Sequence, residues 1–200
     1  MKRCAAFSLP ELLTVLVIVS VLFTVGASAF HQSASRRLAA SGEVIGSMVS
    51  LARSTAFNKR RPTALAVPVS GEHAYRMMAL FVCEPTASGQ EVWKQGIPWE
   101  SLPAPVVFDP QAPLLAASSD APAGFPAKVR ITGKDIAASE LRFLIFNARG
   151  MVETTGVPRL RLVAGTLEGN QLTAHTNAGT HPFYDILFPE AVRGVKYRQP

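Results

Sequence analysis

Charged residues and cysteines are scarce in this 200-residue chain. Only 17% of the residues are charged and 48% are hydrophobic, so the composition is far from that of a disordered tail. Two cysteines occur, Cys4 and Cys83, and only Cys83 would remain if the first six residues were removed. A single cysteine cannot form an intrachain disulfide, so cysteine usage does not identify the redox compartment.

Motifs for catalysis or metal binding are also missing. The four histidines lack metal-ligand spacing, and the acidic residues are too dispersed for a calcium loop. The glycines match neither a P-loop nor a dinucleotide fingerprint, and no G-x-S-x-G occurs. Cys83 lies in the apolar run ALFVCEP and is expected to be a small buried core residue. These gaps favour a protein that is not an enzyme and that has no catalytic residues, cofactor or metal.

The most prominent feature that the sequence does have is a long hydrophobic run near its start. Lys2 and Arg3 precede 24 residues, from Phe7 to Phe30, that contain one charge, Glu11. As a helix this run would span about 36 Å, enough to cross a hydrocarbon core of about 30 Å. A secretory signal has a shorter apolar stretch. A plain anchor gives Glu11 no role, although a lone carboxylate in a bilayer is costly.

The stretch AAFSLPELLTVLVIV resembles the N-terminus of type IV prepilins and type II secretion pseudopilins. In that family a short basic leader is cut before a phenylalanine, the new amine is methylated, and a glutamate stands fifth in the mature chain. The resemblance implies cleavage between Ala6 and Phe7, N-methylation of Phe7, and a filament-assembly role for Glu11, which would neutralise the Phe7 amine. Ala6 departs from the family's usual glycine. The alternative for Glu11 is a simple contact with lipid headgroups near a helix N-terminus.

The segment after residue 30 predicts a helix that continues into an amphipathic half. Its apolar residues recur at helical spacing along one stripe: Leu38, Ile45, Val49, Ala52 and Ala56, widened by Val44, Met48 and Leu51. Pro62 forbids continuation, so the helix is expected to end near Arg60 or Arg61. Gly42 and Gly46 either weaken this half or mark a close approach to a neighbour, and the first interpretation is favoured.

Beyond Pro62 the pattern changes to short strands separated by Pro-, Ala- and Gly-rich stretches. TALAVPVS and AYRMMALFVCE predict a hairpin across Gly71-Glu72, and further strands are expected in EVWKQGI, PVVFD, AKVRIT, LRFLIFNA and RLRLVAGTL. KVRI, LRFLIF and RLRL alternate basic and apolar residues, as half-buried antiparallel strands do. The stretch 109–126 is expected to be an exposed loop. Trp93 and Trp99 are expected to pack in the core.

The predicted fold class is therefore α+β, with a pilin-like outline. A long N-terminal helix, transmembrane in its first half and amphipathic in its second, packs on an antiparallel all-β C-terminal domain. The expected organisation is a leader at 1–6, the transmembrane half at 7–30, the amphipathic half at 31–61 and the β-rich domain at 62–200.

The outline also resembles the FimT/GspH group of minor pilins. SLARSTAFNKRRPTALAV resembles that group's passage from the helix to the first strand. LRFLIFNARGMVETTGVPRLRLVAG resembles its next-to-last hairpin, with Phe146 and Gly150 at matching positions.

The resemblance implies a minor pilin or pseudopilin: a membrane-anchored structural subunit of a type II secretion or type IV pilus filament. It would pass once through the inner membrane, with its C-terminal domain in the periplasm. The expected partners are other pilin or pseudopilin subunits, a prepilin peptidase, the inner-membrane assembly platform and membrane lipid.

Two alternatives of other classes stay open. One is a DNA-uptake minor pilin that grips DNA through the tail cations Arg193, Lys196 and Arg198, although a solvated strand end is the favoured interpretation of that tail. The other is a membrane-anchored enzyme, which a deep pocket with converging polar groups would support.

Overall fold

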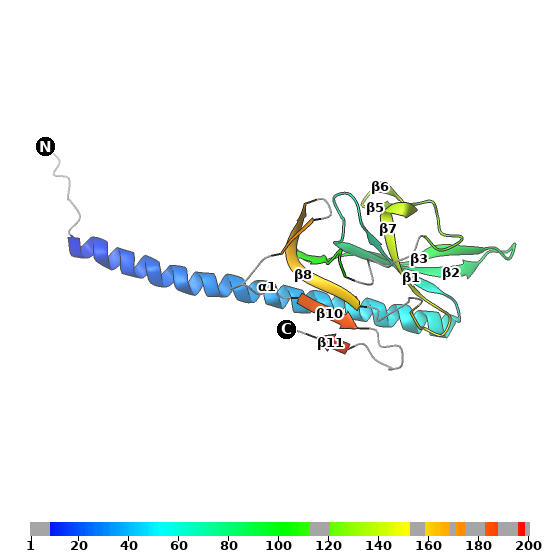
Figure 1. Cartoon of the computed structure of the whole chain (residues 1–200), viewed down its shortest axis with the longest axis horizontal. Coiled ribbons are helices and arrows are strands. Elements are labelled where there is room, and N and C mark those ends of the chain that lie inside the picture. The colour runs from blue at the N-terminus through cyan, green and yellow to red at the C-terminus, as the bar shows by residue number, and fades with distance from the viewer. Residues whose placement is uncertain are drawn as a thin grey trace.

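A computed structural model shows one long helix beside, and projecting beyond, a body of antiparallel strands (Figure 1). The structure describes residues 9–112, 121–152, 159–168, 171–174, 183–187 and 196–198. Within the helix, side chains are described for residues 10–22 and 35–59.

The elements are two helices and eleven strands in the described chain. Helix α1 spans Leu9–Lys59, and the 3-10 helix η1 spans Ala138–Glu140. The strands are β1 (Thr63–Pro68), β2 (Met77–Pro85), β3 (Glu91–Ser101), β4 (Val106–Phe108), β5 (Lys128–Ile131), β6 (Lys134–Ala137), β7 (Leu141–Phe146), β8 (Arg159–Glu168), β9 (Gln171–Ala174), β10 (Phe183–Leu187) and β11 (Lys196–Arg198).

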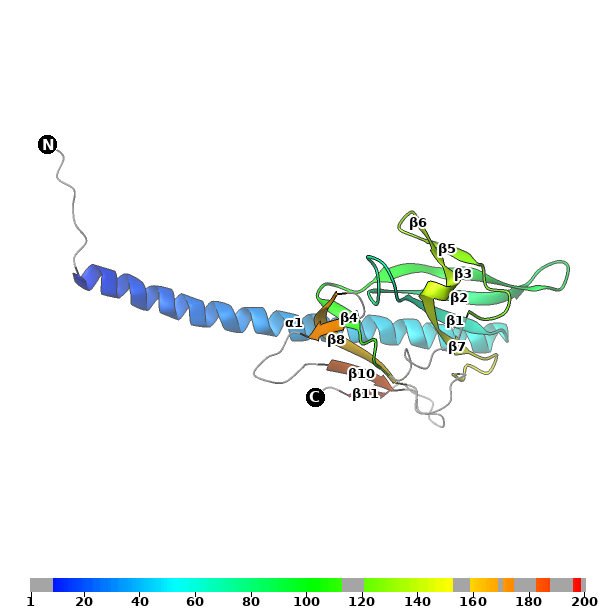
Figure 2. The ribbon, with the colours of Figure 1, turned by 45° about the horizontal axis from the view of Figure 1, so that its top comes forward.

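The strands form two main antiparallel sheets and a separate hairpin. The first sheet has the order β3-β2-β1-β7, and the second has the order β11-β10-β8-β4 with β9 paired to β8. Strands β5 and β6 pair only with each other in the described chain. Figure 2 shows the C-terminal half of α1 running alongside strands of both main sheets.

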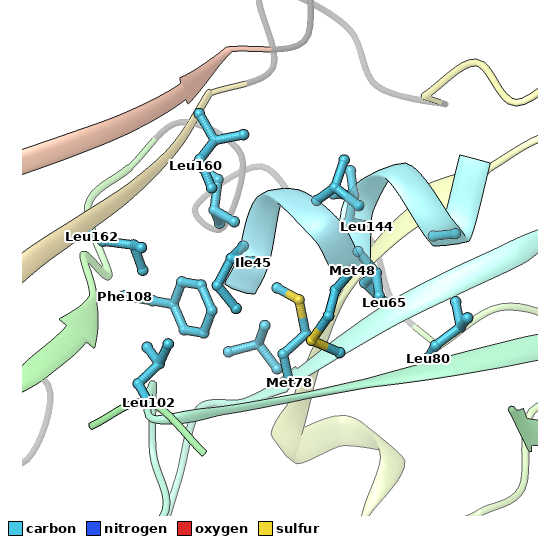
Figure 3. Packing of buried hydrophobic residues seen from close by; sticks show 14 of the residues in the cluster. Ile45, Met48, Leu65, Met78, Leu80, Leu102, Phe108, Leu144, Leu160 and Leu162 are labelled. Atoms are coloured by element: carbon cyan, nitrogen blue, oxygen red, sulfur yellow. The ribbon is translucent and has the colours of Figure 1, made fainter. Parts of the chain in front are cut away.

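The main core lies between α1 and these two sheets. Figure 3 shows Ile45 and Met48 of the helix among side chains from both sides. Leu65, Met78, Leu80 and Leu144 come from the first sheet, and Phe108, Leu160 and Leu162 come from the second. The helix is therefore the element that joins two sheets which do not pair with each other directly in the described part.

The predicted apolar stripe of α1 is confirmed in its central positions. Leu38, Ile45, Val49, Ala52 and Ala56 are all buried, with 5% or less of each exposed. The predicted widening of the stripe is right only for Met48. Val44 and Leu51 are 41% and 46% exposed, because the sheets meet the helix on one side only.

Gly42 lies at a close approach, and the favoured interpretation of it as a mere weak point is wrong. A Cβ atom at this position would lie 2.6 Å from Cζ of Tyr184 in β10, which is itself 5% exposed. The absence of a side chain lets the ring of Tyr184 pack directly on the helix.

Several strand predictions are confirmed, and four strands were missed. Strands β1 and β2 form the predicted hairpin, with Thr63 opposite Val82 and Ala66 opposite Ala79. Strands β6, β9, β10 and β11 were not predicted. The turn of the expected hairpin is formed at Gly150, where Phe146 bridges Val152. In the described residues β7 does not pair with β8, because β7 pairs with β1 and β8 pairs with β4, β9 and β10.

A second hydrophobic cluster lies on the other face of the first sheet. Phe125 contacts the rings of Phe81 and Phe143 edge-on, with centroids 4.9 and 4.7 Å apart. Trp93 belongs to this cluster and is 8% exposed, and its indole N–H donates to the carbonyl of Ala123 at 3.0 Å. The prediction that Trp93 packs in the core is confirmed.

Cys83 is also a core residue of this cluster, as predicted. It is 1% exposed, and its thiol is free. Burial raises the pKa of the Cys83 thiol, and the nearby Glu91 carboxylate raises this pKa further. A thiol kept protonated in this way is a poor nucleophile.

The expected fold class and location need correction. Among the residues that the structure describes, no helix is both long enough and apolar enough to cross a membrane. The expectations of a transmembrane half at 7–30 and of a single pass through the inner membrane are corrected by this finding. The described fold is a mostly antiparallel sheet structure with helices α1 and η1.

A chain shortened by residues 1–31 should fold on its own. Among the helix side chains that the structure describes, those buried in the main core begin at Leu38, so this deletion removes none of them. Far-UV circular dichroism should show mainly strand signal with a smaller helical part. A spectrum dominated by helix, or by unordered chain, would contradict the packing described above.

Candidate functional site

The N-terminal half of α1 presents an apolar surface that no described element covers. Figures 1 and 2 both show this half projecting beyond the strands. Nine apolar side chains there are between 48% and 65% exposed: Leu12, Leu13, Val15, Leu16, Val17, Ile18, Val19, Val21 and Leu22. Exposed apolar side chains gathered in this way mark an association surface rather than an ordinary solvent-facing helix.

The local sequence explains why this segment is helical and why its surface is so apolar. Pro10 lies in the first turn, where its missing N–H costs little. The hydroxyls of Thr14 and Ser20 donate to the carbonyls of Pro10 (2.7 Å) and Leu16 (2.8 Å) within the helix. These polar groups are thus satisfied internally and do not oppose burial of the surface.

Glu11 is the one charged residue among the described side chains of this half. It lies in the first turn of α1, where a negative charge interacts favourably with the helix dipole, and it is exposed. The predicted cleavage residues Ala6 and Phe7 lie outside the described residues. The proposed pairing of Glu11 with the Phe7 amine therefore stays a prediction.

This surface can associate with another apolar surface, because association would bury its exposed side chains. A Val, Leu or Ile side chain that goes from exposed to buried contributes about 1.5–3 kcal/mol, so a side chain already half covered contributes about 1 kcal/mol. Nine such side chains are enough to hold a helix against similar helices, even after the entropic cost of association is subtracted. Glu11 at one end of the surface would then favour one axial register.

The tail cations are only partly described. Arg193 lies outside the described residues, whereas Lys196 and Arg198 belong to β11, whose backbone pairs with β10. Arg198 is in register with Asp185, and Lys196 is in register with Leu187. Strand β11 is thus the edge strand of the second sheet, and a shared site for the three cations stays a prediction.

Asp185 in β10 is the buried charge of the second sheet. It is 4% exposed, and Arg161 of β8 donates two hydrogen bonds to it, at 2.8 and 3.0 Å. The hydrogen bond to Asp185 raises the pKa of Arg161, whose guanidinium also lies 4.1 Å from the centroid of the Phe183 ring. Arg159 approaches the same carboxylate at 3.7 Å. These residues hold β8 and β10 together and leave little free charge on Arg161 for a ligand.

The described residues give little support to the alternative that the protein is an enzyme. No group of three or more His, Cys, Asp or Glu side chains in the described part could hold a metal ion. One hollow of about 510 Å³ is lined by Val69, Ser70, Gly71, Glu72, Ala74, Arg76 and Leu167. Ser70 there donates to Glu140 at 2.6 Å, and the hydrogen bond from this hydroxyl lowers the pKa of Glu140. This lowered pKa makes the Glu140 carboxylate a weak base for activating Ser70 as a nucleophile.

Sequence reasoning missed one exposed group at the far end of α1. Phe57 is 66% exposed and lies beside Arg60 and Arg149 in a second hollow. The sequence could have predicted this exposure, because Phe57 lies off the apolar stripe of α1 that was expected to be buried.

Comparison of the chain with known protein families finds no matching family. The same search among characterised proteins finds no similar sequence, and among solved structures it finds no similar fold.

Proposed function

We propose that the protein is a structural subunit of a helical filament of the pilin or pseudopilin type, as used by type II secretion and type IV pilus machines. The observation that carries the proposal is the projecting half of α1, which exposes nine apolar side chains and has Glu11 in its first turn. In such a filament these surfaces pack against one another, and the strands form the outer body. The work of the subunit is assembly rather than catalysis.

The proposed partners follow from this role. Other pilin or pseudopilin subunits would cover the apolar surface, a prepilin peptidase would remove the leader, and an assembly platform would add the subunit to the filament. The sequence MKRCAAFSLPEL supports the peptidase, because it places a basic leader, a phenylalanine and a glutamate in the order that this enzyme class handles.

Processing is the experiment that tests this proposal. When the chain is produced together with a prepilin peptidase, cleavage should occur between Ala6 and Phe7, leaving Phe7 as a methylated N-terminus. Mass spectrometry of the purified protein would show the loss of the leader and the added methyl group. A chain that still begins at Met1, or that is cut after Ala29, would argue against a filament subunit of this type. The Phe7→Ala variant changes the residue directly after the expected cut and shows whether cleavage depends on the phenylalanine.

A further inference from the structure

A hollow of about 490 Å³ lies at the C-terminal end of α1, far from the apolar N-terminal half. It is lined by Phe57, Asn58 and Arg60 from the helix end and by Ala148 and Arg149 from the turn after β7. Phe57 is 66% exposed, the highest value among the large hydrophobic side chains described. The hollow therefore combines one uncovered aromatic ring with two guanidinium groups.

The backbone at Arg60 is unusual for the residue that occupies it. The helix ends in a Schellman motif, in which Arg60 N–H donates to Phe57 O (3.3 Å) and Arg61 N–H donates to Ala56 O (3.1 Å). Arg60 is the left-handed residue of that motif, with a φ of 51°. Glycine is preferred here, because a side chain in the left-handed region is strained. An arginine at a glycine position is a cost in stability that a ligand contact would explain.

The opposite wall of the hollow is held rigidly against the helix. Asn147 Oδ1 accepts hydrogen bonds from the backbone N–H groups of Arg149 (2.9 Å) and Met151 (3.1 Å). Arg53 of α1 donates to the carbonyl of Gly150 at 3.0 Å, which fixes the turn to the helix. The backbone that carries Arg149 is therefore held in place beside the helix end, and ordering on binding is confined to exposed side chains such as that of Arg149.

The charge available in the hollow is that of two arginines. None of the described residues that line it is acidic. Neighbouring cations are engaged elsewhere, since Lys59 pairs with Glu84 at 3.3 Å and Arg53 donates to Gly150. Two guanidinium groups match one carboxylate, and the adjacent ring and Ala148 match one apolar side chain.

We propose that this hollow is a docking site for a protein segment that carries a carboxylate next to an apolar side chain. Arg60 and Arg149 bind the carboxylate, and the apolar side chain packs on Phe57. A nucleic acid fits less well, because binding it requires a groove with cations along several phosphates. The proposal concerns a surface distinct from the N-terminal half of α1 and does not depend on the filament role.

The test is a titration of the full-length protein, kept in mild detergent to cover its exposed apolar helix, followed by NMR at the amides of residues 57–60 and 148–150. The probe is an acetylated, amidated peptide with the central sequence Leu-Glu. Its comparison is the same peptide with Leu-Gln, and a third peptide ends in leucine with a free carboxylate. The first and third peptides distinguish a side-chain carboxylate from a chain terminus, and a short oligothymidylate provides the nucleic-acid arm.

We expect the Leu-Glu peptide to bind about tenfold more tightly than the Leu-Gln peptide. Binding of the free-carboxylate peptide alone would overturn the proposal in favour of a chain terminus. Arg60→Gly should weaken binding by about tenfold while the thermal midpoint stays equal or rises, because the left-handed strain is removed. Arg149→Ala should weaken binding similarly. Arg36→Ala, which removes one exposed charge elsewhere on α1, should bind like the parent.

The proposal is overturned if the Leu-Gln peptide binds as tightly as both carboxylate peptides, or if none of the three shifts these amides. The proposal is also overturned if the Arg60→Gly or the Arg149→Ala variant binds the peptide as tightly as the parent. Tighter binding of the oligothymidylate than of every peptide would replace the protein segment with a nucleic acid. Should the Arg60→Gly chain fail to fold, the Arg149→Ala variant decides alone, because Arg149 is exposed and its side chain supports no described core contact.

Discussion

A chain with Glu11→Val should be processed normally and yet fail almost completely to enter filaments. In the proposed assembly Glu11 neutralises the amine of Phe7 within packed helices. Breaking a buried charge pair by removing one partner costs about 3–5 kcal/mol, because the other charge is left without compensation. Added apolar surface from the valine does not offset that cost. The measurement is crosslinking of the variant to the major subunit in cells that assemble the filament.

Two further variants make this result specific. Glu11→Gln should fail more mildly, since an amide accepts a hydrogen bond but carries no charge. Glu72→Val makes the same substitution at an exposed glutamate that pairs with Lys134 at 3.5 Å, and it should enter filaments normally. If Glu11→Val crosslinks as well as Glu72→Val, the carboxylate has no part in assembly.

Gly42→Ala should destabilise the fold by about 2 kcal/mol, although alanine is the better helix former. On an isolated helix this change would stabilise by about 1 kcal/mol. In the folded chain the added Cβ would overlap the ring of Tyr184, which is buried and held in β10. The free energy of unfolding in urea, measured for parent and variant, gives the sign directly. An increase in stability would show that Gly42 is only a weak point of the helix.

The ring contact can be tested by a second substitution. Tyr184→Leu shortens the side chain, so the double variant should lose less stability than the sum of the two single changes. Ser50→Ala, at an exposed position of α1, makes a comparable change in helix propensity without the contact and should raise stability slightly. If the effects of Gly42→Ala and Tyr184→Leu on the free energy of unfolding are additive, the destabilisation by the alanine does not come from contact with the Tyr184 ring.

Much of the fold could be predicted from local pattern. The apolar spacing from Leu38 to Ala56 identifies the face of α1 that is buried, because a helix turns every 3.6 residues whatever surrounds it. The short apolar runs of β1 and β2 on either side of the Gly71 turn identify the hairpin, again from local pattern. The apolar character of Cys83 places it in the core. Each of these predictions depends on residues that are neighbours in the chain.

The candidate site was predicted only in part. Glu11 and the apolar residues after it stand out in the sequence, and the structure places them on the projecting half of α1. A hydrophobic run does not state what will cover it, and the expected transmembrane half is corrected by the described helix. Lys196 and Arg198 were interpreted as part of a solvated strand end, and the structure places them in edge strand β11; its pairing with β10 was not predicted, because backbone groups carry no sequence signal.

Other features depend on contacts between residues far apart in the sequence. Val44 and Leu51 fit the helical stripe, yet they remain exposed because the two sheets reach the helix from one side. Gly42 has its role only because β10 brings Tyr184 to it. Arg60 and Arg149 line the same hollow because Arg53 fixes the turn after β7 to the end of α1. Local periodicity determines which face of each element is apolar, but only the packed chain determines which element meets that face and which side chains converge beside it.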